Sequence, residues 1–288
     1  IVTVIDKENG HYGSCINAAL PVAKGKYVKV LDADDWFDPE GFGYLVDKLQ
    51  SLDNDLVITN YTKRYVSEST QIRYCSHDYM VGCDVLTSFS SMLPNLSMHA
   101  VAYRMKLLRK MNYKQSEGVH HSDVEWFFCP LFFVKTLAFV NADVYQHFLA
   151  RVGQSSDPAV FKKNLSHRQV VALRILEYYF TVNRDSLSKQ TDAYLFRLMK
   201  EFIASIYKSY LWQSDNDFVP NTLESFDQAI REINEPFYNS LLEEVVHRWI
   251  PIHYIRYWRT HSKRFPIQCI LKTIKQIADL IRFHKTYV

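Results

Sequence analysis

The second half of this sequence lacks glycine. All eight glycines of the 288-residue chain lie at or before Gly153. Glycine is the residue of tight turns and close backbone approach, so its disappearance indicates a change of architecture. Beyond it, apolar residues at helical spacing predict helices over 166–183, 192–213, 223–246 and 266–284. We therefore expect an α/β domain over residues 1–156 and a helical accessory domain over residues 157–288.

Other absences narrow the classes of protein. The sequence has no apolar run of about eighteen residues, so we expect no membrane-spanning helix. Its five cysteines are scattered and form no C-x-x-C pair, which favours a reducing cytoplasm. The patterns G-x-x-x-x-G-K-[ST], H-E-x-x-H and G-x-S-x-G are absent too, so P-loop, zincin and hydrolase functions lack support.

The chain does contain a cluster of carboxylates, the sequence D-A-D-D at residues 32–35. It follows residues 27–31, whose alternation and β-branched residues predict a strand. Like charges at the end of a strand repel one another, and burying them is costly unless a cation compensates. Mg²⁺ and Mn²⁺ prefer such oxygen ligands and keep positions open for a phosphate. The alternative is an exposed acidic turn that leads into a helix starting at Asp38 and Pro39.

The residues before this cluster predict a crossover. Residues 1–6 are an apolar strand, residues 7–14 a loop with two glycines, and residues 16–20 a short helix that leads to the acidic strand. Strand, loop, helix and strand in this order predict a right-handed parallel connection. Ligands of such sheets lie beyond the carboxyl ends of the strands, so we expect the glycine loop beside the carboxylates. There Asn9, Gly13 and Asn17 would line a bound diphosphate; a tight turn with a helix cap is the alternative.

From Val4 to Trp36 the sequence VIDKENGHYGSCINAALPVAKGKYVKVLDADDW resembles family 2 glycosyltransferases of the GT-A type. The resemblance covers about residues 1–155. It implies a Rossmann-like, mostly parallel sheet and a metal-dependent, inverting enzyme that uses a nucleotide-sugar. It also implies that Asp32 faces the ribose and that Asp34 holds Mn²⁺ or Mg²⁺. The family normally begins with a strand, a helix and a second strand that read the base, whereas this sequence begins inside the third strand. We expect the base-binding half to belong to the natural protein.

A second acidic cluster lies at residues 122–125. Ser122 is a good N-cap, and Asp123 and Glu125 would fill the first turn of a helix, which by itself is a structural role. The same geometry suits a general base that deprotonates an acceptor hydroxyl. The resemblance assigns that role to Asp123, with Glu125 as the second choice. Trp126 could stack on a sugar or pack in the core.

A third cluster follows a strand predicted over residues 137–145. Arg151 could clamp the leaving diphosphate, where fixed positive charge is most useful. Gln154 and Ser155 resemble a G-Q-S loop that closes over the donor in some family members. The resemblance also makes His147 a metal ligand, although a lone histidine on a strand is more often simply a partly buried residue.

The last segment, residues 247–288, is strongly basic. It holds nine Lys or Arg and one acidic residue, whereas the whole chain has a net charge of +3. Its final predicted helix is amphipathic, which is typical of a helix at a membrane surface. Packing on the helical domain with a solvated basic face is the alternative. A nucleic-acid partner has no supporting motif, and we expect none.

Together these patterns predict a glycosyltransferase that moves a sugar from a nucleotide-diphosphate sugar to a hydroxyl of a glycan or lipid-linked glycan, in cell-surface or capsular polysaccharide synthesis. We expect a cytoplasmic protein with peripheral contact at the inner membrane surface. A non-catalytic binding module and a metal-dependent nucleotidyltransferase remain alternatives.

Overall fold

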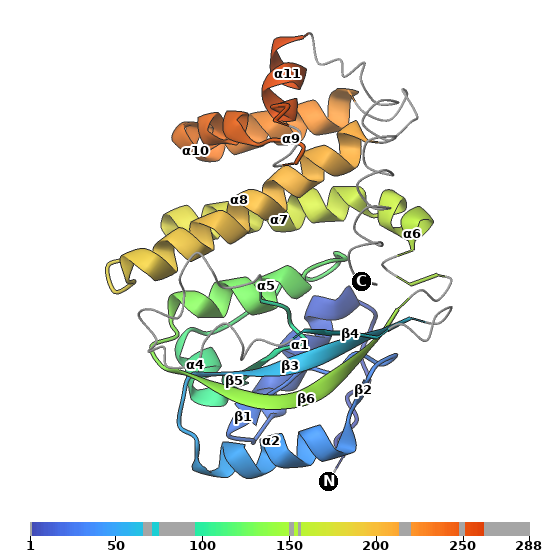
Figure 1. Ribbon diagram of the computed structural model, residues 1–288, viewed down its shortest axis with the longest axis vertical. Coiled ribbons are helices and arrows are strands. Elements are labelled where there is room, and N and C mark those ends of the chain that lie inside the picture. Colours follow the sequence, from blue (N-terminus) through green and yellow to red (C-terminus); the bar gives the residue numbers. More distant parts are fainter. Residues whose placement is uncertain are drawn as a thin grey trace, which may run out of the picture. The chain divides into compact units, whose positions relative to one another are not determined.

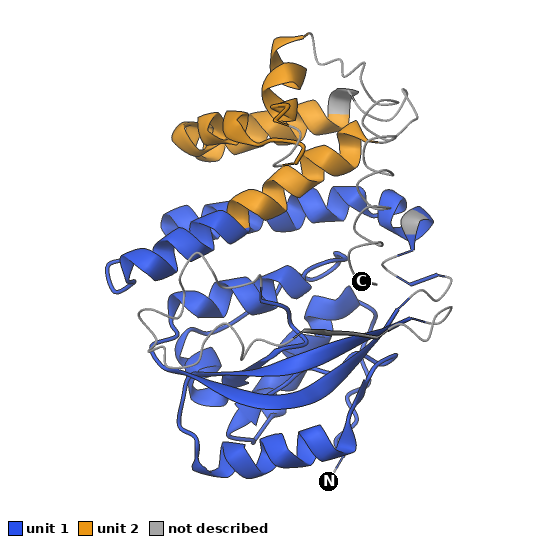
Figure 2. Cartoon of the chain, viewed as in Figure 1, with its two compact units in different colours: residues 1–198 blue, residues 199–288 orange. Residues whose placement is uncertain are grey.

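The computed structural model describes residues 2–65, 71–74, 96–149, 153–154, 157–212, 220–247 and 251–261. The chain divides into two compact units, residues 1–198 and residues 199–288 (Figure 2). This division falls later than residue 157, because the first helices after that point belong to the first unit. The separation of a transferase domain from a helical accessory domain at 156/157 stays a prediction.

The first unit is built on one sheet, in the order β1-β5-β3-β6-β2, with β4 paired to β3 (Figure 1). Its two long strands, β3 and β6, lie at the centre of that order. Both carry apolar, β-branched residues, and β6 contains the strand predicted over residues 137–145. The strands are β1 (Tyr27–Val28), β2 (Trp36–Phe37), β3 (Leu56–Tyr65), β4 (Gln71–Tyr74), β5 (Val101–Arg104) and β6 (Leu137–Leu149).

The pairing differs from the mostly parallel sheet that we expected. Among the described strands only β3 and β6 pair in parallel, while the other four pairs are antiparallel. Residues 2–6 are not a strand, and the acidic strand is reduced to the two residues of β1. The parallel crossover predicted between these two segments is therefore absent from the described residues. An extended segment becomes a strand only where a neighbour supplies its hydrogen bonds, and β1 finds that neighbour in β5.

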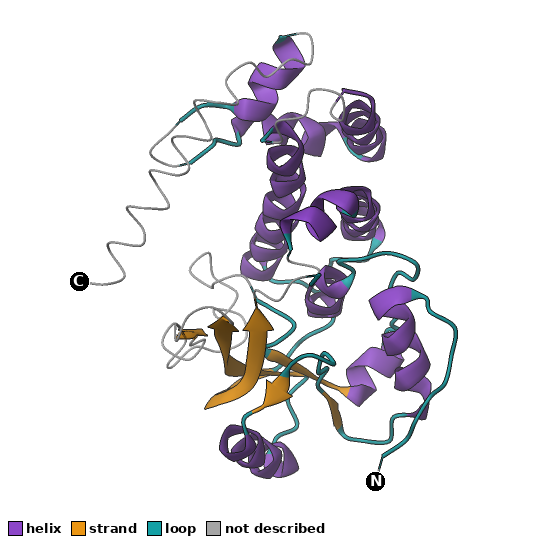
Figure 3. Ribbon diagram, turned by 90° about the vertical axis from the view of Figure 1, so that its right-hand side faces the viewer, coloured by secondary structure: helices purple, strands orange, loops and turns teal. Residues whose placement is uncertain are grey.

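Helices cover both faces of this sheet (Figures 1 and 3). On one face lies α2 (Pro39–Ser51), which begins as the sequence predicts: the Asp38 side chain accepts a hydrogen bond from the Gly41 amide, at 2.8 Å. Leu45 of α2 packs into a buried cluster with residues of β3, β5 and β6. On the opposite side of the sheet lies α5 (Asp123–Phe128), and the unit also contains α1 (His11–Val22), α4 (Met105–Lys110) and the short 3₁₀ helix η2 (Cys129–Phe132).

The first unit continues through α6 (Pro158–Lys163) and α7 (Leu165–Thr181) into the start of α8 (Lys189–Leu211). The bounds of α7 and α8 lie close to the predicted helices 166–183 and 192–213. None of the described helices is long and apolar enough to span a membrane.

The second unit contains the end of α8 together with α9 (Pro220–Ile233), α10 (Glu235–Ser240), the 3₁₀ helix η3 (Leu241–Glu243) and α11 (Tyr254–Thr260). The single helix predicted over 223–246 is interrupted, because the Asn234 side chain accepts a hydrogen bond from the Phe237 amide and starts a new helix. Buried aromatic side chains, including Tyr207 and Trp258, form the core of this unit. The helix predicted over 266–284 lies outside the described residues.

Candidate active site

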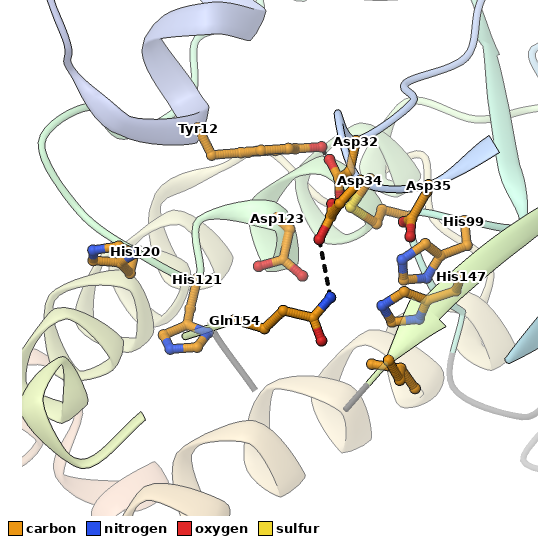
Figure 4. Close-up of a pocket in the computed structure, with 12 residues that line it drawn as sticks. Tyr12, Asp32, Asp34, Asp35, His99, His120, His121, Asp123, His147 and Gln154 are labelled. Carbon is orange, nitrogen blue, oxygen red and sulfur yellow. Dashed lines mark hydrogen bonds between the residues drawn. The ribbon is translucent and has the colours of Figure 1, made fainter. Parts of the chain in front are cut away.

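A cavity of about 240 Å³ opens in the first unit where the acidic turn, the end of β6 and the start of α5 meet (Figure 4). Four carboxylate and four imidazole side chains line it. The residues that line it are Tyr12, Asp32, Asp34, Asp35, Met98, His99, His120, His121, Asp123, His147, Leu149 and Gln154. The cavity therefore joins segments that are widely separated in the sequence.

Strand β6 fixes the shape of the acidic turn. The Tyr145 hydroxyl donates a hydrogen bond to Asp35 Oδ2 at 2.6 Å and accepts one from the Asp32 amide at 3.1 Å. The Phe148 amide donates to the other oxygen of Asp35 at 2.7 Å. Asp35 thus anchors the turn to the sheet, which leaves Asp32 and Asp34 to present their side chains to the cavity.

The electrostatics of the turn are those of a site that needs a cation. The pKa of Asp32 is raised to about 7, chiefly by burial and then by the neighbouring charges of Asp35, Asp123 and Asp34. Burial and these neighbouring carboxylates therefore disfavour the ionised form of Asp32. A divalent cation removes that penalty, because it supplies the opposite charge within the same cavity.

Two histidines stand beside these carboxylates. His99 precedes β5 and His147 belongs to β6; their rings stack with centroids 4.0 Å apart. Burial, and then the neighbouring charges of His147 and Lys29, lower the pKa of His99 to about 2, so its imidazole is neutral. Asp35, His99 and His147 offer ligand atoms that all lie within 4.8 Å of one another. These donors fit a divalent metal, and His147 was among the residues predicted for it.

The other predicted metal ligand, Asp34, lines the same cavity but is not part of that three-residue group. Its Oδ2 accepts a hydrogen bond from Gln154 Nε2 at 3.0 Å, and the same amide donates to the Phe148 carbonyl at 2.7 Å (Figure 4). Gln154, predicted to contact the donor, therefore ties the end of β6 to the acidic turn. Arg151 and Ser155 lie outside the described residues.

Asp123 begins α5 and faces the cavity opposite the acidic turn (Figure 4). Burial raises its pKa, while the backbone N–H groups of Asp123 and Val124 and the charge of Arg168 act in the opposite direction. Ser122 makes no side-chain cap of this helix, so the capping role expected for it is not observed. A carboxylate held at a helix start beside a cavity is well placed to accept a proton.

The two residues that follow are turned away from the cavity. Glu125 is completely buried and accepts a hydrogen bond from the Ser116 amide at 2.8 Å. Trp126 is also completely buried, packed edge-on against Tyr103 and Tyr113. Neither side chain lines the cavity. Trp126 is therefore a core residue, which was the alternative that the sequence analysis gave for it.

The residues of the glycine loop and the start of α1 lie close to the cavity, but they contact neighbouring backbone of the same chain instead. Asn9 Oδ1 accepts a hydrogen bond from the His11 amide, at the start of α1. Asn17 exchanges hydrogen bonds with the backbone of Gln115, at 2.9 Å in each direction. Gly13 packs so closely on this segment that a Cβ would lie 1.9 Å from the Ser116 carbonyl oxygen. None of these three residues lines the cavity; their predicted contact with a diphosphate stays a prediction.

Several cavity residues were not singled out from the sequence. Tyr12 reaches the acidic turn from α1, and burial followed by the charges of Asp32 and Asp123 raises the pKa of its hydroxyl. His99 carries no pattern that marks it, because only the folding of β5 beside β3 brings it to the cavity. His120 and His121 also line the cavity.

Comparison with known proteins supports the resemblance and the fold that the sequence predicted. Residues 1–112 match the family model described as glycosyl transferase family 2. The uncharacterized glycosyltransferase YibD of Escherichia coli (strain K12) is 26% identical over 187 residues, which are 61% of this chain and 54% of that protein. The putative glycosyltransferase EpsH of Bacillus subtilis (strain 168) is 22% identical over 174 residues, 57% of this chain and 49% of that protein.

Solved structures show the same fold. The crystal structure of S. aureus TarS 1–349 in complex with UDP-GlcNAc matches with a TM-score of 0.58 and 14% identity, covering 94% of this chain and 74% of that one. The predicted resemblance to family 2 glycosyltransferases and the predicted GT-A type α/β fold are confirmed. The chain spans about half the length of the curated relatives described above.

Proposed function

We propose that this protein is a metal-dependent, inverting glycosyltransferase. The observation that carries the proposal is the shared cavity: Asp34 and His147, predicted to hold a metal, line it together with Asp123, the predicted base. A carboxylate cluster that can hold a cation and a separate carboxylate opposite it are what such a reaction requires. The raised pKa of Asp32 supports the same reading, since the turn favours a cation.

In the proposed reaction, the acceptor hydroxyl oxygen forms a bond to the anomeric carbon while the bond from that carbon to the diphosphate oxygen breaks. Asp123 accepts the hydroxyl proton, and the nucleoside diphosphate leaves with the bonding electrons. A divalent cation, when bound, neutralises the charge that develops on the leaving diphosphate. Asp32 would face the ribose, and Asn9, Gly13, Asn17, Arg151 and Ser155 are the further residues proposed to contact the donor.

For the donor we propose a nucleotide-diphosphate sugar, since the similar TarS structure binds UDP-GlcNAc. The proposed acceptor is a hydroxyl of a glycan or lipid-linked glycan in polysaccharide synthesis. The basic residues of 247–288 support peripheral contact with a cytoplasmic membrane surface. This location is a proposal that the charge pattern motivates.

Isothermal titration of a panel of nucleotide-diphosphate sugars in the presence of Mn²⁺ tests the proposal. One sugar nucleotide should bind to the wild-type protein, and Asp34→Ala should weaken its binding by at least about tenfold, because the metal loses an oxygen ligand. Equal binding by both proteins would contradict the assigned role of Asp34. A protein that binds no sugar nucleotide at all would contradict the proposal itself.

The same experiment separates the alternatives. A nucleotidyltransferase would bind a nucleoside triphosphate and release pyrophosphate. A non-catalytic module would bind a sugar nucleotide and leave it intact during prolonged incubation with Mn²⁺ and glycan acceptors.

A further inference from the structure

Beside the acidic turn, the cavity contains a pair of imidazoles. His99 and His147 stack with an interplanar angle of 23°, and both point toward Asp35 (Figure 4). Only His147 was expected from the sequence. The ligand atoms of the three side chains lie within 4.8 Å of one another, although His99 precedes β5 and the other two belong to different parts of the chain.

His99 is held in place from several directions. Its Nδ1 lies 2.6 Å from Ser97 Oγ, and its backbone carbonyl accepts a hydrogen bond from Lys29 Nζ at 2.8 Å. The ring also packs against Tyr61 and Tyr145, with centroid distances of 5.3 and 4.7 Å. When Nδ1–H donates to Ser97, the lone pair of Nε2 is left for a ligand. Metal-binding imidazoles are commonly fixed by such a second hydrogen bond.

The other two donors also have capacity for a cation. His147 Nδ1 is buried and has no hydrogen-bond partner among the described residues. A buried polar atom without a partner is costly and indicates a missing ligand or solvent. Asp35 accepts one hydrogen bond on each oxygen, from Tyr145 and Phe148, and a carboxylate has further lone pairs.

We propose that His99 is a second imidazole ligand, beside His147 and Asp35, and that it gives the site a preference for later first-row metals over Mg²⁺. The inference rests on the proposed function in that it concerns the metal of the same cavity. Nitrogen donors favour transition metals, whose affinity rises from Mn²⁺ to Co²⁺, whereas Mg²⁺ prefers oxygen ligands and retains water. A turn of carboxylates alone would bind Mg²⁺ and Mn²⁺ with little discrimination.

Titration with the metals alone tests this selectivity. The wild-type protein should bind Co²⁺ more tightly than Mn²⁺, and Mn²⁺ more tightly than Mg²⁺. His99→Phe keeps a ring against Tyr61 and Tyr145 but has no donor atom. It should lose Co²⁺ affinity by about 10–100-fold, with Mg²⁺ affinity changed less than about threefold. His120→Phe is the matched control: it alters a cavity histidine outside the group and should leave both affinities unchanged.

Pulsed electron paramagnetic resonance of bound Mn²⁺ provides a second measurement, the number of imidazole nitrogens that are coupled to the metal. The wild-type spectrum should show couplings to two imidazole nitrogens, and the His99→Phe spectrum one. A single coupled nitrogen in the wild-type protein, or wild-type Co²⁺ affinity in a folded His99→Phe variant, would overturn the inference. Two coupled nitrogens without any binding of a sugar nucleotide would uphold it and sink the proposed function instead.

Discussion

At the scale of single residues, the carboxylates of the cavity have different proposed roles, although they lie close together. Asp35 is tied to β6 by two hydrogen bonds and holds the turn in shape. Asp34 is oriented by Gln154, and Asp123 is placed opposite them at the start of a helix. Their positions relative to the sheet, rather than their chemical type, separate the proposed base Asp123 from Asp34 and Asp35, the proposed ligands, of which Asp35 also anchors the turn.

The role of Asp123 can be tested by Asp123→Asn, which keeps the shape of the side chain and removes its basicity. We expect turnover to fall by about 10²–10⁴-fold, while the affinity for the sugar nucleotide stays nearly constant. Steady-state kinetics and titration measure the two quantities. Glu125→Gln is the control, because glutamine still accepts the hydrogen bond from the Ser116 amide. A variant at Asp123 with normal turnover, or loss of turnover in a stable Glu125→Gln, would reassign the base.

The raised pKa of Asp32 predicts a pH dependence in the metal-free protein. The carboxyl titrates near 3.8 when unfolded and at about 7 when folded, so the folded state binds more protons between these values. Its contribution to stability is therefore full below about pH 4 and is lost as the pH rises to about 7. Asp32→Asn should flatten this dependence and raise the free energy of unfolding at pH 8 by about 1–2 kcal/mol.

Urea unfolding at pH 5 and pH 8 in the presence of a chelator measures the effect. A wild-type protein whose difference in stability between the two pH values equals that of Asp32→Asn would show that the carboxyl is not perturbed. Adding Mn²⁺ at pH 8 should stabilise the wild-type protein more than the variant, since the cation interacts favourably with the ionised Asp32 carboxylate.

At the scale of elements, the cavity depends on the packing of α1 against the segment before α5. Asn17 and Gln115 exchange hydrogen bonds, and Gln115 Nε2 continues the connection to the carbonyl of Ser122, next to the proposed base. Glu125 holds the same segment through the Ser116 amide. These contacts explain the residues of the glycine loop by the packing of α1 alone, without a bound ligand.

Two glycines in helices give a matched test of that packing. Gly13→Ala in α1 would place a methyl group 1.9 Å from the Ser116 carbonyl oxygen, whereas Gly43→Ala in α2 meets nothing within 4 Å. We expect Gly13→Ala to destabilise the protein by about 1–3 kcal/mol. Gly43→Ala should stabilise it by about 0.5–1 kcal/mol, because alanine favours helix. Chemical denaturation compares the two, and equal effects would show that α1 can move away without cost.

Most long elements follow from local pattern. The strand β6 and the helices α7 and α8 have bounds close to those predicted, since their apolar residues recur with the period of the element that they form. The errors concern segments whose state depends on a partner. Residues 2–6 have the residues of a strand but no strand to pair with, and the helix over 223–246 ends where Asn234 caps a new one.

At the scale of the whole molecule, the charge is uneven along the chain. The net charge of the whole chain is only +3, although the segment 247–288 is strongly basic. The structure describes residue 247 and residues 251–261 of this segment. In that described part Trp258 is completely buried, so it is a core residue of the second unit. The membrane contact proposed for residues 247–288 therefore does not use the Trp258 side chain.

Vesicle flotation tests the membrane proposal. Each basic residue near an anionic surface contributes about 1 kcal/mol, so Lys272→Gln with Lys275→Gln should weaken binding to phosphatidylserine vesicles by at least about tenfold. Lys48→Gln with Lys110→Gln, two exposed lysines of the first unit, removes the same charge elsewhere and should have little effect. Equal flotation of both variants and the wild-type protein would end the proposal, as would wild-type protein that does not float.

The sequence by itself indicated the resemblance to a family, the acidic turn and several of the long elements, because these depend on residues that are close together along the chain. It also indicated Asp34, Asp123, His147 and Gln154, which the cavity brings together. Only the tertiary structure decided that β1 and β5 pair antiparallel, that Glu125 and Trp126 are buried, and that His99 stands beside His147. Those facts arise from contacts between distant segments, whose geometry is set by the packing of the sheet and not by any local pattern.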